Sequence, residues 1–188
     1  MSYIEYPVPT EEEFRSCRSE TGRYRHLTAR YCSGAGVDLA SQGVPVVPWA
    51  IQFDLPEKEF LHYSSGNQPA SPIPLRGHAD KLPFTDNSLD FVYSSHLLED
   101  YLDWNPVLNE WLRVLKHGGH LIIMVPDKKL WNDAIQLRGQ PPNCAHRHES
   151  CQGELTRYLE PKGVVVVKDE LTNVVEFDYN ILFVGIKK

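Results

Sequence analysis

The chain has 188 residues, of which 41% are hydrophobic and 23% are charged, a composition typical of a globular protein large enough to bury its own core. Its 19 lysines and arginines are outnumbered by 25 aspartates and glutamates, and it has no run of basic residues, which argues against a nucleic-acid scaffold or an anionic membrane surface as the main partner. The sequence has no apolar stretch of membrane-spanning length and no signal-like segment, so we expect a cytoplasmic protein with a single domain over residues 1–188. Its four cysteines lack C-x-x-C spacing, so we expect free thiols.

Residues 1–32 predict an arm followed by a helix. Two prolines in residues 1–9 favour an extended arm, and Thr10 with Glu13 three residues later predicts a capped helix start. We expect the helix to continue towards Cys32, with a break near Gly22. Its arginine-rich face is most simply a solvated surface; alternatively, this segment closes over a pocket as a lid. The tyrosines that would wall such a pocket are Tyr3, Tyr6 and Tyr24.

Two short apolar runs, residues 36–40 and 50–53, predict the first two strands of a parallel sheet. They are too short to give a helix a stable buried face, and glycine and proline bound them. The second run ends on Asp54. In dinucleotide-type α/β folds an acid at this place binds the hydroxyls of a ribose, and the turn after the first strand lets a ligand approach the backbone. The pattern therefore indicates a nucleoside-binding edge.

The rest of the chain predicts alternating strands and helices. Residues 55–72 are rich in proline, serine, glycine and asparagine, which indicates that the crossover from the second to the third strand is shortened to a loop or a single turn. The alternation predicts an α/β fold, with a doubly wound, mainly parallel sheet and helices on both faces. The later elements are strands at 73–79, 89–94, 120–125, 164–167 and 179–186, a helical turn at 97–101, and helices from Asn105-Pro106 to Gly118-Gly119, at 127–138 and at 153–159.

Two motifs resemble a known family. Residues 82–99 include Leu82-Pro83-Phe84 and Ser94-Ser95-His96, and residues 110–119 follow at the family's spacing. Together they resemble the small single-domain class I S-adenosylmethionine-dependent methyltransferases, and the match covers most of residues 36–185. The resemblance implies S-adenosylmethionine as the cofactor, a Rossmann-like core over residues 33–188, and a seven-stranded sheet whose last strand is antiparallel and inserted beside the others.

The resemblance also implies a cofactor site. The methionine end would lie against the turn after the first strand, the ribose on Asp54, the adenine beside the end of the third strand, and the sulfonium at the Ser94-Ser95-His96 corner. Whether His78 or Asp80 meets the exocyclic amine is open. The positions that match the family's site are Asp38, Ala40, Ser41, Gln42, Gly43, Asp54, Leu55, His78, Ala79, Asp80, Ser94 and Ser95.

The first turn departs from the family's Asp-x-Gly-x-Gly pattern, because Ala40 and Gln42 replace two glycines. A positive φ at Gln42 would cost about 1 kcal/mol, roughly a tenfold loss of affinity. A degenerate binding or regulatory protein is therefore the alternative to an enzyme. A nicotinamide dehydrogenase is disfavoured, since the G-x-G-x-x-G turn is absent.

Three histidines are the catalytic candidates: His96 at the fourth strand's end, and His146 and His148 in the loop after the fifth strand and its helix. Histidine is the natural base near neutral pH, although each of the three could equally be a structural or solvated residue. Cys144 and Cys151 flank the last two, but this spacing matches no common zinc motif, so we expect no metal. We expect methyl transfer to a small molecule, no nucleic-acid or membrane partner, and possible homodimers.

Overall fold

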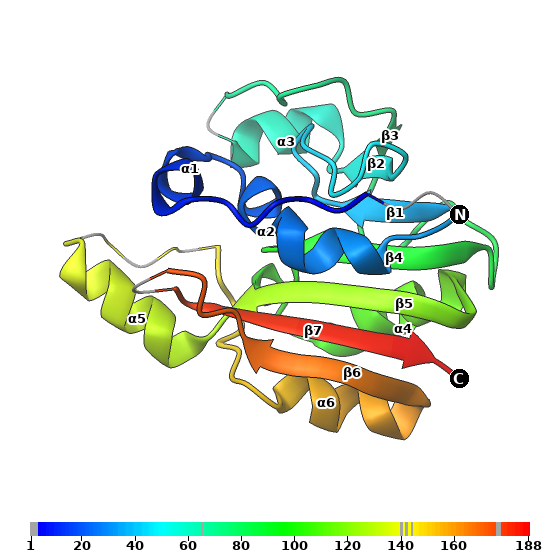
Figure 1. Cartoon of the computed structure of the whole chain (residues 1–188). Helices are drawn as coiled ribbons and strands as arrows, with labels where there is room; N and C mark the ends of the chain where they lie inside the picture. Colours follow the sequence, from blue (N-terminus) through cyan, green and yellow to red (C-terminus); the bar gives the residue numbers. More distant parts are fainter. Residues whose placement is uncertain (1–3, 65, 140, 142, 144, 176–177) are drawn as a thin grey trace.

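The computed structural model describes residues 4–64, 66–139, 141, 143, 145–175 and 178–188. Within them, seven strands form one sheet in the order β3-β2-β1-β4-β5-β7-β6 (Figure 1). Neighbouring strands run parallel except at β7, which is antiparallel to both β5 and β6. This confirms the doubly wound sheet with an inserted antiparallel last strand. The strands are β1 (Gly36–Leu39), β2 (Ile51–Asp54), β3 (Leu75–Arg76), β4 (Leu89–Ser95), β5 (Leu115–Pro126), β6 (Val164–Leu171) and β7 (Asn180–Lys187).

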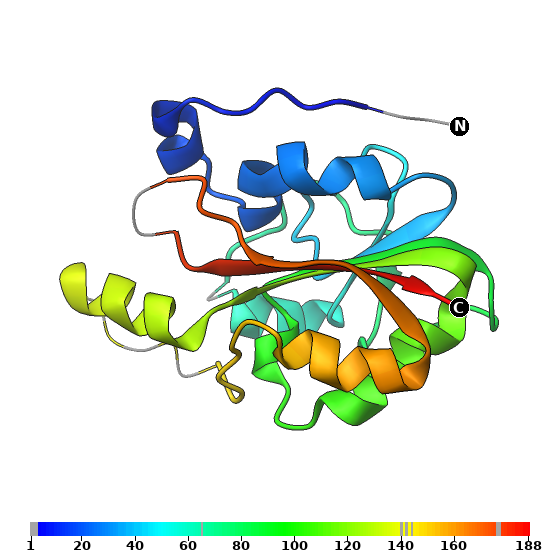
Figure 2. The same ribbon diagram turned by 60° about the horizontal axis from the view of Figure 1, so that its bottom comes forward.

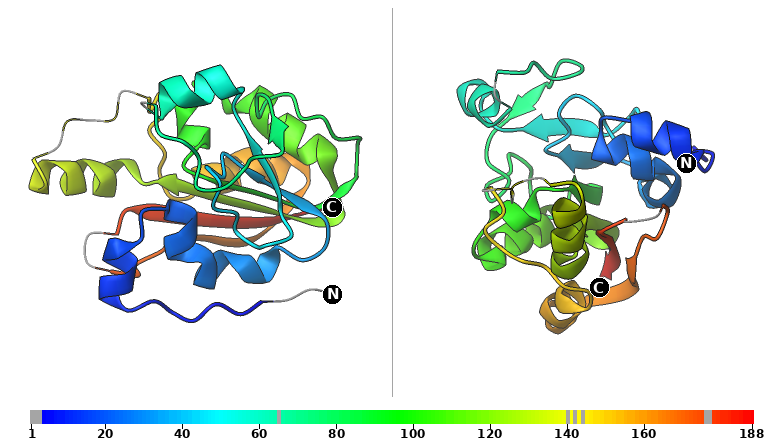
Figure 3. Two further views of the ribbon diagram at one scale, coloured as in Figure 1. Left: turned by 90° about the horizontal axis from the view of Figure 1, so that it is seen from above. Right: turned by 90° about the vertical axis from the view of Figure 1, so that its left-hand side faces the viewer.

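Helices cover both faces of the sheet. Figure 2 shows α1 and α2 on one face and α4 and α6 on the other. α5 continues from the end of β5 and projects past the sheet, as the left view of Figure 3 shows. Among the described residues, no helix has the length and apolar character needed to cross a membrane. The helices are α1 (Glu11–Ser16), α2 (Glu20–Thr28), α3 (Glu57–Tyr63), α4 (Trp104–Val114), α5 (Lys128–Leu137) and α6 (Glu154–Leu159).

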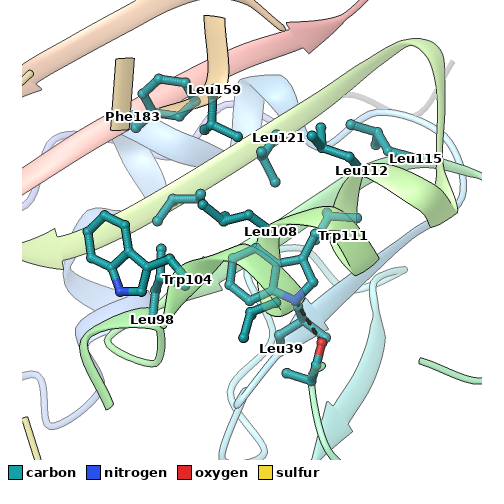
Figure 4. Close-up of a cluster of buried hydrophobic side chains, with 14 of the residues drawn as sticks. Leu39, Leu98, Trp104, Leu108, Trp111, Leu112, Leu115, Leu121, Leu159 and Phe183 are labelled. Atoms are coloured by element: carbon teal, nitrogen blue, oxygen red, sulfur yellow. Dashed lines mark hydrogen bonds between the residues drawn. The ribbon is translucent and has the colours of Figure 1, made fainter. Parts of the chain in front are cut away.

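The apolar face of α4 forms much of the core on its side of the sheet (Figure 4). Val107, Leu108 and Trp111 recur at helical spacing and are fully buried. The indole Nε1–H of Trp111 also donates to the carbonyl of Ala79 at 2.9 Å. Trp104, which starts the helix and is equally buried, has no partner for its Nε1–H among the described residues. Trp111 therefore ties α4 to the segment that follows β3.

The N-terminal helix differs from its prediction in where it breaks. The capping box at Thr10 and Glu13 is present, as expected. However, α1 ends at Ser16 and α2 begins after Ser19, whose hydroxyl accepts from the N–H of Gly22. Gly22 thus lies in the first turn of α2, not at a break. The guanidinium of Arg23 donates to the carbonyls of Phe14, in α1, and of Cys17, which caps α1, and so stabilises the corner between the helices.

Three further boundaries differ. α4 ends at Val114, before Gly118-Gly119, because Leu115 already pairs with Leu89 and the chain enters β5 there. β3 is only two residues long, and β6 continues to Leu171, beyond the strand predicted at 164–167. The crossover between β2 and β3 is shortened as predicted, but it contains the seven-residue α3 in place of a single turn.

Candidate active site

The carboxyl ends of β1, β2 and β4 meet at one edge of the sheet. Leu39 pairs with Phe53 on one side and with Ser94 on the other. The residues that follow these three positions therefore gather around one crevice, the usual ligand-binding place in an open α/β sheet. The right view of Figure 3 faces the end of the molecule at which the parallel strands finish.

The first part of this crevice, here called the Asp54 pocket, is mainly apolar. Of the residues expected to bind the cofactor, it contains Ala40, Asp54, Leu55 and Ala79. His78 and Asp80 are exposed and do not line it, and His78 Nε2 lies 3.6 Å from a carboxylate oxygen of Glu59. The complete lining is Ala40, Phe53, Asp54, Leu55, Gly77, Ala79, Leu97 and Tyr101.

The Asp54 carboxylate is 5% exposed and is held by the backbone around it. Its Oδ2 accepts from the N–H of Gln42 at 2.9 Å, and its Oδ1 accepts from the N–H of Leu55 at 2.8 Å. Burial raises the pKa of Asp54, while these two hydrogen bonds oppose that rise. A carboxylate has about four acceptor positions, so each oxygen keeps capacity for a ligand hydroxyl.

A second pocket, here called the His96 pocket, shares Ala40 with the first, so the two adjoin. Arg18, which precedes α2, and Glu20, its first residue, bring opposite charges to this pocket. The predicted Asp38, Gly43 and Ser94 do not line it; Asp38 is fully buried and accepts from the N–H of Val46 at 2.6 Å. Its lining is Arg18, Ser19, Glu20, Thr21, Ala40, Ser41, Gln42, Ser95 and His96.

The expected tyrosine wall does not form from the two tyrosines that the structure describes. Tyr24 is buried and donates its hydroxyl hydrogen to Asp178 at 2.8 Å, and Tyr6 lies against Arg25. Tyr3 lies outside the described residues. The N-terminal segment nevertheless contributes to the site, because residues 18–21 line the His96 pocket.

Strained backbone surrounds the His96 pocket. Ala40, Gln42 and His96 have φ of 59°, 50° and 53°, in the left-handed region that glycine favours. Ala40 and Gln42 thus adopt the conformation expected of the glycines they replace. The side chain of Gln42 is exposed and does not fill the Asp54 pocket. Such strain clusters at functional sites, where the surrounding structure maintains it.

Relieving this strain should stabilise the protein. We expect Gln42→Gly to raise the free energy of unfolding by up to about 1 kcal/mol, because glycine adopts positive φ without a Cβ clash. Gly43→Ala, one residue on, should destabilise, since its φ is 83° and a Cβ there would lie 2.3 Å from the backbone nitrogen of Ser71. Urea unfolding of both variants measures the difference. A lower unfolding midpoint for Gln42→Gly would contradict the assignment of strain to this position.

A buried carboxylate joins two of the three histidine candidates. Glu99 lies in the 3-10 helix η2 (Leu98–Asp100) and is 1% exposed. Its Oε1 lies 3.3 Å from His96 Nδ1 and 3.8 Å from His146 Nε2. Burial alone would lower the pKa of His96, but Glu99 and Glu20 outweigh it and raise that pKa to about 9. His96 is therefore a cation at neutral pH.

The side chain of His148 contacts Glu154 and Trp104. Its Nε2 lies 2.7 Å from a carboxylate oxygen of Glu154, and its ring lies over Trp104 with centroids 4.1 Å apart. These contacts attach the loop to α6 and α4. His146 and His148 both line a third pocket, here called the Trp131 pocket, but only His146 also reaches Glu99. The lining is Pro126, Lys128, Trp131, Asn132, Asn143, His146, His148, Glu149 and Ser150.

Several site residues were not predicted from the sequence. Glu99 lies inside the motif at 82–99, but its contact with two histidines depends on a loop more than forty residues away. Glu20 and Trp131 likewise enter through separate helices. Among the described residues, no three histidines, cysteines or acids are grouped so as to hold a metal. Cys144, one of the four positions weighed as zinc ligands, lies outside them.

Comparisons with known proteins identify the family of the chain. The model of a family described as a methyltransferase domain matches residues 21–123. A probable S-adenosylmethionine-dependent methyltransferase of Mycolicibacterium smegmatis is 31% identical over 140 residues, which are 74% of this chain and 51% of that protein. The uncharacterized protein YafE of Escherichia coli is 43% identical over 98 residues, 48% of this chain and 45% of that protein. The chain thus spans about half the length of these curated relatives.

The fold also matches solved structures. A Thermotoga maritima protein described as an S-adenosylmethionine-dependent methyltransferase, possible histamine N-methyltransferase, has a TM-score of 0.65 and 21% identity, covering 90% of this chain and 88% of that one. The PH0226 protein of Pyrococcus horikoshii has a TM-score of 0.60 and 21% identity, covering 96% and 94%. At this identity the likeness concerns the fold.

Proposed function

The chain belongs to the methyltransferase-domain family, and on that basis we propose that it is an enzyme that transfers a methyl group from S-adenosylmethionine to a small-molecule acceptor. When bound, this cofactor supplies an electrophilic methyl group on a sulfonium sulfur. Transfer forms a bond from the acceptor to the methyl carbon, and the carbon–sulfur bonding pair stays on sulfur. We also propose that residues 1–188 act as one domain.

The position of Asp54 is the observation that carries this proposal. Its carboxylate lies in the lining of a mainly apolar pocket, with acceptor capacity free for two ribose hydroxyls. Leu55, Ala79 and Leu97 give that pocket the apolar walls that suit a flat adenine ring. The chemistry of these lining residues therefore suits the adenosine half of the cofactor.

The charges of the His96 pocket fit the methionine half. An amino-acid end carries one carboxylate and one ammonium group. Arg18, which has no ion pair among the described residues, and the cationic His96 suit the carboxylate. The carboxylate of Glu20, whose buried Oε2 has no hydrogen-bond partner in the described structure, suits the ammonium. These two pockets share Ala40, at the point where the two halves of the cofactor join.

Isothermal titration of the wild-type protein with S-adenosylmethionine and S-adenosylhomocysteine tests the proposal. We expect a one-to-one complex with a dissociation constant in the micromolar range, about 8 kcal/mol of binding free energy. No binding at millimolar ligand would instead support the alternative considered from the sequence, a degenerate binding or regulatory protein on the same fold. Ala40 and Gln42 would then be the residues that changed the site.

A further inference from the structure

Five side chains form a closed ring of contacts between the His96 pocket and the Trp131 pocket. The ring centroids of His96 and Tyr179 are 6.2 Å apart, those of Tyr179 and Trp131 are 4.9 Å apart, and those of Trp131 and His146 are 5.3 Å apart. Glu99 closes the ring by lying between the two histidines. His96 directly follows β4, Glu99 lies in η2, Trp131 lies on α5, His146 lies in the loop after α5, and Tyr179 directly precedes β7. The fold thus brings the two pockets together at one edge of the sheet.

The two histidines that share the Glu99 carboxylate differ in the direction of their pKa shifts. His96 is held as a cation by Glu99 and Glu20. Burial lowers the pKa of His146; Glu99 opposes that shift, and the charge on His96 adds to it. The lowered pKa favours the neutral form of His146. The Nε2 atom of His146 lies 3.8 Å from the Glu99 carboxylate, and attraction to that negative charge favours the tautomer with the N–H proton on Nε2, which leaves a free lone pair on Nδ1. No hydrogen bond to Nδ1 is found among the described residues.

The Trp131 pocket has the features of a site for a planar, uncharged molecule. Trp131 and His146 present two rings, and Pro126 adds an apolar wall. The charged residues in its lining, Lys128 and Glu149, pair with each other and cancel. The hydroxyl of Ser150, a residue only 2% exposed, has no hydrogen-bond partner within the described structure, so a polar group is available to a ligand there.

We propose that the Trp131 pocket holds the methyl acceptor, that the acceptor is an uncharged planar molecule with an ionisable hydroxyl group, and that Nδ1 of His146 takes the hydroxyl proton. This assignment rests on the proposed methyl transfer. Glu99 does not touch the acceptor; it is a positioning residue that fixes the tautomer of His146 and keeps His96 charged.

The proton balance follows from these roles. The hydroxyl oxygen forms its new bond to the methyl carbon, and the O–H bonding pair stays on that oxygen. The proton passes to Nδ1 of His146 and makes a transient imidazolium, which the Glu99 carboxylate stabilises across Nε2. Loss of that proton to solvent restores the neutral ring. Charged groups that bear on the titration of His146 are Glu99 and His96 beside it, Asp100 and Arg147 next to them in the chain, and the Lys128–Glu149 pair.

Nuclear magnetic resonance of nitrogen-labelled protein tests the tautomer of His146 and the charge of His96 without cofactor. In the wild type, the His146 ring should be the neutral Nε2–H tautomer at neutral pH. Glu99→Gln, which keeps the shape but removes the charge, should mix the two tautomers of His146 and lower the pKa of His96 by about one unit or more. His62→Asn, at an exposed position on α3, is the control and should change neither.

Phenol and its methyl ether anisole then probe the pocket, because they differ in the ionisable hydroxyl. Phenol should shift the signals of Trp131 and His146, and His146→Asn should weaken phenol binding about three- to tenfold more than it weakens anisole binding, because both ligands lose the ring contact and only phenol loses the hydrogen bond. The acceptor site would be refuted if the tautomer of His146 were unchanged in Glu99→Gln. It would also be refuted if phenol shifted other signals but not those of Trp131. If either occurs while S-adenosylhomocysteine binds normally, this assignment alone fails; absent S-adenosylhomocysteine binding refutes the proposed function.

Discussion

Asp54→Ala should weaken the binding of S-adenosylhomocysteine by about two orders of magnitude. Two effects contribute. The variant loses the charged acceptor for the ribose hydroxyls, worth about 1.5–3 kcal/mol. It also removes the hydrogen-bond acceptor for the N–H groups of Gln42 and Leu55, so the strained turn at Gln42 loses the contact that holds it. Isothermal titration of the variant beside the wild type measures the change.

Two further variants separate these effects. Asp54→Asn keeps one carbonyl acceptor and the side-chain shape, and we expect an intermediate loss of affinity. Asp133→Ala removes an exposed carboxylate that pairs with Lys129 on α5, and it should leave binding unchanged. The assignment of Asp54 to the ribose fails if Asp54→Ala binds within threefold of the wild type while remaining folded.

Trp111→Phe should destabilise the protein by about 1–2 kcal/mol more than Trp104→Phe. Both tryptophans lie on α4, are at most 2% exposed and lose similar volume in the change. They differ in one contact, since Trp111 donates to the carbonyl of Ala79 and Trp104 Nε1 has no partner among the described residues (Figure 4). Removing the donor leaves a buried carbonyl without its hydrogen bond. Thermal or urea unfolding measures the difference.

The Trp111 contact also bears on the ligand site. Ala79 lines the Asp54 pocket, so the bond from Trp111 fixes part of the expected adenine slot. We therefore expect Trp111→Phe to weaken cofactor binding more than Trp104→Phe does. Equal stability losses in the two variants would mean that packing volume alone, and not the hydrogen bond, stabilises this end of α4.

Local patterns were sufficient to predict most of the fold. Short apolar runs bounded by glycine and proline marked β1 and β2, and the helix expected from Asn105-Pro106 corresponds to α4. Boundaries were less predictable where tertiary contacts decide them. Gly118-Gly119 resembles a helix end, but pairing of Leu115 with Leu89 ends α4 earlier. The corner between α1 and α2 depends on Arg23, whose role cannot be read from sequence spacing.

The residues of the candidate site likewise include some that local sequence predicts and some that depend on tertiary contacts. Asp54 was predictable because the end of a strand is a local feature, and the turn at Ala40 and Gln42 keeps the backbone form of the glycines it lacks. The contact between Glu99 and His146 was not predictable, since it joins η2 to the loop after α5, and only the folded chain brings these two segments together. His78 and Asp80 follow β3 in the sequence, but the short strand leaves both side chains exposed, and only Ala79 enters the pocket.

A crystal structure with S-adenosylhomocysteine would test directly whether the cofactor binds at Asp54. We expect both ribose hydroxyls within hydrogen-bond distance of the Asp54 carboxylate, the adenine between Leu55 and Ala79, and the amino-acid end beside Arg18, Glu20 and His96. Adenosine bound elsewhere, or an Asp54 carboxylate that contacts only the backbone of Gln42 and Leu55 in the complex, would contradict it.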